Sequence, residues 1–317
     1  MKKNTAKVTN SLQPITPPPL QKGDTIAFAA PARNTSTENI AFAQRFFEEN
    51  GFKVRIDEEM WAVENQFAGS DAHRAQHLNR LFDDSSVKAI VCVRGGYGSL
   101  RMVDQLDPKT IQKHPKWLAG FSDITVIHSH FLRQFHMESL HSSMPIDFPT
   151  NSDAALESLL NCLTGKSTEL SFDAHMLNKS GEATGPLVGG NLSILYSLVG
   201  SASFPETKGR ILFIEDVDEY LYHIDRMMLS LKRAGHLHGI AGLIVGGMTK
   251  MNDNAIPFGK DAEAIINEHV MDYNYPVCFG FPAGHQPENH TLIIGRMAML
   301  TVETQKKCKF AQELPFI

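Results

Sequence analysis

The sequence is poor in cysteine, and its few cysteines are far apart. Cys92, Cys162, Cys278 and Cys308 form no C-x-x-C pair, and three of the four lie in or beside apolar runs. This spacing argues against a disulfide framework and does not suit a zinc site. We therefore expect buried thiols and a reducing compartment.

Long apolar runs and an excess of basic charge are also missing. No apolar stretch approaches the ~20 residues that a membrane helix requires. Residues 1–20 contain lysines but lack the apolar core of a secretory signal. The net charge is −5 and the isoelectric point is about 6.3, so the composition favours neither a nucleic-acid partner nor an anionic membrane. We expect a cytoplasmic protein.

The 317 residues are enough for two domains with a substantial core. In the first half, apolar segments that suit strands alternate with amphipathic segments that suit helices. Strands are predicted at 24–30, 52–56, 87–93 and in the segment that ends at Ser122, and helices at 35–50, 70–82, 99–106 and 123–135. This alternation is typical of a doubly wound α/β domain, in which ligands bind at the carboxyl ends of the strands.

The second half has a mixed pattern. Residues 166–185 are polar, irregular and contain glycine, and we interpret them as a domain junction. Helices are then predicted up to Val199 and at 222–234, and strands at 210–214, 240–245, 277–279, 291–294 and 297–303. Gly295-Arg296 between the last two predicts an antiparallel hairpin. We therefore predict an N-terminal domain over 1–165 and a mixed α/β domain over 166–317.

The segment 117–125 (Trp-Leu-Ala-Gly-Phe-Ser-Asp-Ile-Thr) predicts a short strand, a sharp turn with Ser122 at its apex, and a helix. A serine at such a turn is exposed near the positive end of a helix dipole, where backbone N–H groups can stabilise an oxyanion. The pattern resembles the Gly-x-Ser-x-Gly nucleophile elbow, although Ile124 occupies the fifth position. A serine that caps the helix is the alternative.

A second turn, Gly-Gly-Tyr-Gly at 95–98, follows the buried strand predicted at 87–93. It lacks the spacing of a dinucleotide fingerprint and the Gly-Lys-Ser/Thr of a P-loop, so nucleotide binding is not favoured. An oxyanion hole formed by the backbone N–H groups of Gly96 and Asp123 would need glycines here, because backbone must come close to the reacting group. A tight strand-to-helix turn is the other interpretation.

Acid and base candidates lie in the second half. Glu215 and Asp216 end a buried strand, where an unpaired carboxylate would be costly. A carboxylate there forms a salt bridge, for instance with Arg226, or orients a histidine, and the residues alone favour the salt bridge. His285 lies in a Gly/Pro-rich loop and is a general-base candidate, because histidine titrates near neutrality. A surface loop histidine is the alternative. The chain order Ser122, acid, histidine also occurs in α/β-hydrolases.

Two histidine pairs look like metal ligands, but we do not expect them to bind a metal. His128 and His130 would point about 200° apart on a helix and could not share one ion. His236 and His238 follow a helix end and have no obvious acidic third ligand. We expect neither a metal nor another cofactor.

Seven segments in this order resemble the LD-carboxypeptidase family, the muramoyltetrapeptide carboxypeptidases, which includes relatives that give self-immunity to microcin C. They are Lys-Gly-Asp-Thr-Ile at 22–26, Phe-Ala-Gly-Ser-Asp at 67–71, Val-Arg-Gly-Gly-Tyr-Gly at 93–98, Gly-Phe-Ser-Asp-Ile-Thr at 120–125, Gly-Gly-Asn-Leu at 189–192, Phe-Ile-Glu-Asp-Val at 213–217 and Gly-His at 284–285. The resemblance covers nearly the whole chain. It implies a Rossmann-like N-terminal domain, a smaller C-terminal domain and a Ser-Glu-His triad at their interface.

Carried over by motif, the resemblance implies Ser122 as nucleophile, Glu215 as acid and His285 as base. It also implies oxyanion donors near Gly96 and at Asp123. The family often has His-Gly-Pro after the nucleophile helix, whereas this chain has His-Ser-Ser-Met-Pro at 141–145. This departure affects the local substrate contacts.

The function implied is a cytoplasmic serine carboxypeptidase that acts on small muropeptides in murein recycling. It would cut between the L-centre of a diamino acid, diaminopimelate or lysine, and a terminal D-alanine. Arg94 and Arg226 are the candidate cations for the terminal carboxylate. The alternatives are a microcin-immunity-type amidase that acts on peptidyl or aminoacyl nucleotides, and a non-catalytic two-domain protein that binds peptides. The family also suggests a homodimer.

Overall fold

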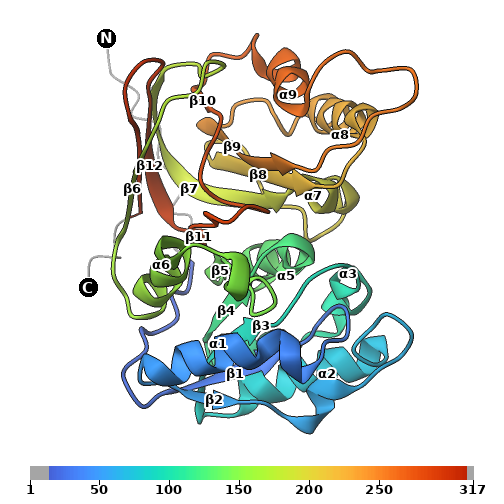
Figure 1. Cartoon of the computed structure of the whole chain (residues 1–317), viewed down its shortest axis with the longest axis vertical. Coiled ribbons are helices and arrows are strands. Elements are labelled where there is room, and N and C mark those ends of the chain that lie inside the picture. Colours follow the sequence, from blue (N-terminus) through green and yellow to red (C-terminus); the bar gives the residue numbers. More distant parts are fainter. Residues whose placement is uncertain (1–13, 313–317) are drawn as a thin grey trace, which may run out of the picture.

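A computed structural model describes residues 14–312 as two lobes, each built around one sheet (Figure 1). The first sheet has the order β11 (Leu292–Ile294), β5 (Ser139–His141), β4 (Trp117–Gly120), β3 (Val87–Cys92), β1 (Thr25–Ala29) and β2 (Lys53–Arg55). The second has the order β10 (Val277–Cys278), β9 (Gly242–Thr249), β8 (Ile211–Val217), β7 (Gly181–Asn191), β12 (Met297–Val302), β13 (Cys308–Gln312) and β6 (Thr168–Phe172).

The described helices lie between and beside these strands. The α-helices are α1 (Thr37–Glu49), α2 (Asp71–Asp83), α3 (Ser99–Met102), α4 (Pro108–Lys113), α5 (Thr125–His130), α6 (Asp153–Leu163), α7 (Leu192–Leu198), α8 (Leu221–Arg233) and α9 (Ala262–Val270). Short 3₁₀ turns are η1 (Glu58–Trp61), η2 (Val103–Gln105), η3 (Ser122–Ile124) and η5 (Phe148–Thr150), and η4 (Phe131–Phe135) is a π-helical turn. None of the helices described between residues 14 and 312 has the length and apolar character needed to span a bilayer.

In the first sheet, strands β5, β4, β3, β1 and β2 are parallel, and their apolar side chains divide between two faces. Along β3, Ile90 and Cys92 join the core cluster that includes α2, whereas Ala89 and Val91 join the cluster that includes α1 and α6. Because successive side chains of a strand point to opposite faces, a continuous apolar strand needs helices on both sides. The predicted doubly wound α/β lobe is confirmed.

The second sheet mixes parallel and antiparallel pairs. Strands β7, β8, β9 and β10 are parallel, whereas β12, β13 and β6 pair antiparallel. This agrees with the mixed α/β lobe predicted for the second half. β6 and the start of β7 lie in the stretch 166–185, so our interpretation of that stretch as irregular is wrong. The domain boundary at 165–166 stays a prediction.

The hairpin predicted around Gly295-Arg296 is wrong. β11 pairs antiparallel with β5 of the first sheet, whereas β12 pairs with β7 and β13 of the second. The two turn residues bond to β7: Gly295 N donates to Leu187 O and Leu187 N donates to Arg296 O, both at 2.8 Å. The chain therefore crosses from one sheet to the other at this point.

The start of α1 also differs from the prediction. Thr35 and Glu38 have the spacing of a capping box and would place the N-cap at Thr35. The N-cap is instead Ser36, without a capping hydrogen bond from its side chain, so this capping box does not form. By contrast, Asn191 caps α7 through a hydrogen bond from Ile194 N to its side-chain oxygen, at 3.1 Å.

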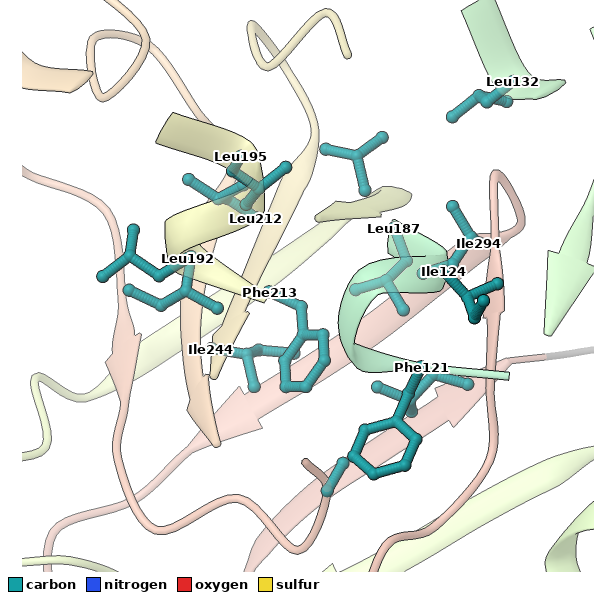
Figure 2. Packing of buried hydrophobic residues seen from close by; sticks show 14 of the residues in the cluster. Phe121, Ile124, Leu132, Leu187, Leu192, Leu195, Leu212, Phe213, Ile244 and Ile294 are labelled. Atoms are coloured by element: carbon teal, nitrogen blue, oxygen red, sulfur yellow. The ribbon is translucent and has the colours of Figure 1, made fainter. Parts of the chain in front are cut away.

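One apolar core cluster continues across both lobes (Figure 2). Phe121 and Ile124, on either side of the Ser122 turn, belong to it together with Phe213 of β8 and Ile244 of β9. The segment that carries Ser122 is therefore packed against the second sheet.

Candidate active site

Ser122 lies just beyond β4, past Phe121, at the carboxyl end of a central strand. Its φ is +61°, in the left-handed region, and it follows the extended residue Phe121. A serine in this region costs on the order of 1–3 kcal/mol and marks a strained turn. The N-cap of η3 is Phe121 and that of α5 is Ile124, so the interpretation of Ser122 as a helix cap is wrong.

Buried polar side chains hold this turn in place. Asp123 Oδ2 accepts a hydrogen bond from Ser99 N at 2.8 Å, which ties the turn to the end of the glycine loop. His128 lies 2.8 Å from Gly120 O through Nε2 and 2.8 Å from Ser139 Oγ through Nδ1. Burial lowers the pKa of His128 to about 3, so the neutral ring donates to Gly120 O and accepts from the hydroxyl. His128 is a structural support of the turn.

The glycine loop 95–98 lies against Ser122. A Cβ atom placed on Gly95 would be 3.3 Å from Ser122 Oγ and 3.2 Å from Asp123 N. Among residues 14–312, no backbone hydrogen bond from Gly96 N or Asp123 N is found. The two N–H groups expected to form the oxyanion hole therefore have no backbone acceptor in the described chain, and Gly95 brings the two segments that carry them into contact.

Glu215 in β8 is completely buried and bonds to His285. Its Oε2 lies 2.6 Å from His285 Nδ1 and 3.2 Å from the backbone N of the same residue. Of the two partners considered for the carboxylate, the histidine is therefore present and Arg226 is not. The prediction of a salt bridge to Arg226 is wrong, because Arg226 is exposed and packs on Tyr222 of its own helix.

The Glu215–His285 pair shifts both pKa values towards the ionised pair. Burial lowers the pKa of His285, but the charge and hydrogen bond of Glu215 outweigh it, so the pKa lies above that of an ordinary histidine. Burial raises the pKa of Glu215, but His285 outweighs it and the pKa is lowered. The imidazole is thus oriented through Nδ1 and has a strengthened affinity for a proton.

Gly284 makes the approach of His285 to Glu215 possible. Its φ is +106°, and a Cβ there would lie 2.7 Å from Glu215 Cβ. Gly284 N donates to Asn289 Oδ1 at 2.8 Å, and Thr249 Oγ1 donates to His285 O at 2.9 Å. The loop is therefore fixed on both sides of the imidazole.

The imidazole of His285 also contacts the segment that carries Ser122. Its ring centroid lies 4.6 Å from that of Phe121, the residue before the serine. No hydrogen bond between Ser122 Oγ and His285 is found among residues 14–312. Glu215 and His285 thus form a direct hydrogen-bonded pair, and the imidazole packs against the residue that precedes Ser122.

Two titratable residues near this pair were missed as site residues. His141 in β5 is buried between Phe121 and Phe213, with ring centroids 5.7 and 4.9 Å apart, and burial lowers its pKa to about 4. Burial raises the pKa of Asp147 to about 6, against the charges of His285 and Arg94. His141 ends β5, and its place at the carboxyl end of a parallel strand was the signal that could have found it.

The two candidate carboxylate-binding arginines lie in different surroundings. Arg94 follows β3 at the start of the glycine loop, and its Nη1 donates to Asn34 O at 3.1 Å. Arg226 is exposed on α8, with its guanidinium 5.1 Å from the centre of the Tyr222 ring. Arg94 therefore lies beside the Ser122 turn, whereas Arg226 packs on its own helix.

The histidine pairs have other partners. His130 Nδ1 lies 2.8 Å from Ser203 Oγ, and the ring of His236 packs on Phe204 with centroids 3.9 Å apart. Within the described part of the chain, no three His, Cys, Asp or Glu side chains are grouped as a metal ion would need.

Comparisons with known proteins agree with this architecture. Residues 26–142 match the LD-carboxypeptidase N-terminal domain, and residues 184–300 match the LD-carboxypeptidase C-terminal domain. A probable murein peptide carboxypeptidase of Bacillus subtilis is 33% identical over 90% of this chain and 92% of its own length. The chain belongs to the LD-carboxypeptidase family. Membership of this LD-carboxypeptidase family makes it a serine-type carboxypeptidase.

Solved structures of this family have the same fold. The muramoyltetrapeptide carboxypeptidase of Oxalobacter formigenes is 26% identical, with a TM-score of 0.83, and the match covers 92% of this chain and all (100%) of that one. An MccF-like protein of Bacillus anthracis is 25% identical, with a TM-score of 0.82, covering 95% and 100% of the two chains. Both branches named by the sequence resemblance are thus similar to this LD-carboxypeptidase in structure.

Proposed function

We propose that this LD-carboxypeptidase releases the terminal D-alanine of cell-wall tetrapeptides, with Ser122 as nucleophile, His285 as base and Glu215 as the acid that orients it. The observation that carries the proposal is the 2.6 Å hydrogen bond between a fully buried Glu215 and His285, beside the strained Ser122 turn. A buried carboxylate that orients a histidine next to a strained serine is the arrangement used in serine acyl transfer.

The proposed reaction has two halves. Because Nδ1–H of His285 donates to Glu215, Nε2 is free to take the Ser122 proton as Oγ attacks the peptide carbonyl carbon. The same imidazole then gives the proton to the leaving D-alanine amine as the C–N bond breaks. Water activated by His285 hydrolyses the acyl-enzyme and restores the serine.

The backbone N–H groups of Gly96 and Asp123 are proposed to stabilise the oxyanion. Gly95 lies against both Ser122 Oγ and Asp123 N, so donors on the two segments can converge on one oxygen. Preorganised donors of this kind contribute about 3–4 kcal/mol each to transition-state stabilisation.

The substrate assignment is supported by the carboxypeptidases of Bacillus subtilis and Oxalobacter formigenes, whose names specify murein peptide and muramoyltetrapeptide. We propose the bond between the L-centre of the diamino acid and D-alanine. The likeness to the MccF-like protein supports a second candidate, an amidase that acts on peptidyl or aminoacyl nucleotides. Cytoplasmic location, homodimerisation and action without a cofactor are further proposals that rest on the family resemblance.

The decisive experiment is mass spectrometry of purified muropeptides incubated with the enzyme. Wild-type enzyme should convert the tetrapeptide to the tripeptide with loss of one alanine, and Ser122→Ala should lower kcat by at least ~10³-fold. Ser197→Ala, an exposed serine on α7, is the matched control, and all three proteins should unfold at similar temperatures. Near-wild-type turnover by Ser122→Ala would eliminate the mechanism. Hydrolysis of an aminoacyl-sulfamoyl adenosine with no loss of alanine would favour the amidase.

A further inference from the structure

Two arginines flank the glycine loop, and neither has a carboxylate partner within salt-bridge distance among residues 14–312. Arg94 is half-buried, with one nitrogen bonded to Asn34 O. Arg33 is exposed and follows β1, the neighbouring parallel strand. Burial lowers the pKa of Arg94, and the charge of Arg33 lowers it further, so the two guanidinium groups repel each other. A half-buried guanidinium beside a second positive charge is costly unless an anion compensates it.

The side chain of Arg33 occupies the space that a side chain at Gly96 would need. A Cβ on Gly96 would lie 2.6 Å from Arg33 Cδ and 2.8 Å from its Nε, and Gly96 has a φ of +102°. The loop is therefore shaped to let the arginine cross it. This contact fixes Arg33 on the loop that also carries one of the proposed oxyanion donors.

The same loop touches the nucleophile one residue earlier. Gly95 lies against Ser122 Oγ, and Gly96 lies against Arg33, so serine and guanidinium are separated by about one residue step of ~3.8 Å plus two side-chain contacts. In a peptide that loses one residue, the terminal carboxylate carbon lies at most ~4 Å from the scissile carbonyl carbon. A carboxypeptidase therefore needs its cations about one residue beyond the atom that the nucleophile attacks, and Arg33 packs on the loop residue next to the one that contacts Ser122.

We propose that Arg33 and Arg94 together bind the terminal carboxylate of the residue that the enzyme removes. This inference rests on the proposed function. Binding of the terminal carboxylate would restrict the enzyme to the last residue of the peptide. Two guanidinium forks can donate to both carboxylate oxygens. Asp147 is the one acidic side chain found to act on Arg94, and it forms no ion pair with it at 4 Å or less, so the pair keeps a net positive charge. Arg226 is not part of this subsite.

The test compares two peptides, a tetrapeptide that ends in D-alanine and the same peptide that ends in D-alanine amide. Wild-type enzyme should prefer the acid. Arg33→Gln should lower kcat/KM for the acid by ~10- to 100-fold, mainly through KM, and change the value for the amide by less than ~3-fold. Arg45→Gln, an exposed arginine on α1 of the same lobe, is the matched control and should leave both values unchanged.

Binding to the Ser122→Ala variant makes the test independent of turnover. In calorimetric titrations that variant should bind the acid more tightly than the amide, and adding Arg33→Gln should remove most of the difference. Equal binding of acid and amide by Ser122→Ala, or an equal loss for both peptides in Arg33→Gln, would overturn the subsite. If the wild-type enzyme released no alanine while Ser122→Ala still preferred the acid, the proposed cleavage would fail and the subsite would stand.

Discussion

The two lobes contribute groups to the candidate site that differ in whether they already have bonding partners. The first contributes a serine at φ +61°, backbone N–H groups without a backbone acceptor and two arginines without a carboxylate partner in the described chain. The second contributes a carboxylate and an imidazole that are already bonded, in a loop held by Asn289 and Thr249. One side of the site presents a strained serine and donors without partners among residues 14–312, whereas the other is closed, with the histidine loop packed against Glu215.

This difference follows from what each side is proposed to do. Proton transfer depends on one tautomer and one ring orientation, and these can be fixed before substrate arrives. Oxyanion donors and cations find their partners only on the substrate. They must therefore be without partners in the free enzyme, so that the substrate can bind to them. On the proposed function, substitutions in the second lobe should therefore damage both chemistry and stability, whereas those in the first should damage chemistry alone.

Glu215→Gln should have the largest effect, a fall in kcat of ~10⁴-fold. It should also move the pH dependence. The charge and hydrogen bond of Glu215 raise the pKa of His285 above its ordinary value, and the base must be neutral to accept a proton. Wild-type kcat/KM should therefore rise with pH through a midpoint above 6.5, and the midpoint should be lower in Glu215→Gln. The measurement is a pH–rate profile of alanine release.

The matched control for that variant is Glu182→Gln, an exposed glutamate in the adjacent strand β7. It should keep the wild-type profile. An acid limb that stays at the same pH in Glu215→Gln would show that another group, such as Asp147, limits the rate on the acid side.

Gly284→Ala should follow, because it forces two changes on the closed side. The new Cβ would lie 2.7 Å from Glu215 Cβ, and alanine is strained at φ +106°. We expect kcat to fall by ~10²- to 10³-fold as the imidazole is displaced, and the free energy of unfolding to fall by roughly 1–3 kcal/mol. Activity assays and denaturant unfolding measure both. An enzyme with normal stability and turnover would mean that the loop has room to move.

The sequence predicted most elements around the site because each is marked locally. β3 and β8 are short apolar runs, and the turn at Ser122 follows such a run and precedes a helix. His285 is marked by the glycine and prolines around it. The partner of Glu215 was harder to predict, since the choice between Arg226 and His285 depends on a loop 70 residues away.

Features set by tertiary pairing could not be predicted from local patterns. β11 is a buried Leu-Ile-Ile run that would suit an edge of either sheet, and it pairs with β5 because that strand leaves an edge free. Arg33 lies in a loop, and no sequence pattern marks it as a site residue. Only the structure shows that its side chain packs against Gly96. His141 appeared only as a departure from a family pattern, since nothing in its neighbours indicates burial between two aromatic rings.

Gly95→Ala should have the smallest effect and is the sharpest test of the comparison. Its Cβ would lie 3.2–3.3 Å from Ser122 and Asp123 N, tight but not overlapping, and the backbone of Gly95 is not in the left-handed region. Because Gly96 N and Asp123 N make no backbone hydrogen bond within the described chain that could be lost, we expect the free energy of unfolding to stay within ~0.5 kcal/mol of wild type. We expect kcat to fall by about 10-fold as these donors shift by a few tenths of an ångström. A loss of stability as large as that of Gly284→Ala would show that the first lobe is as tightly closed as the second, and would remove the distinction between them.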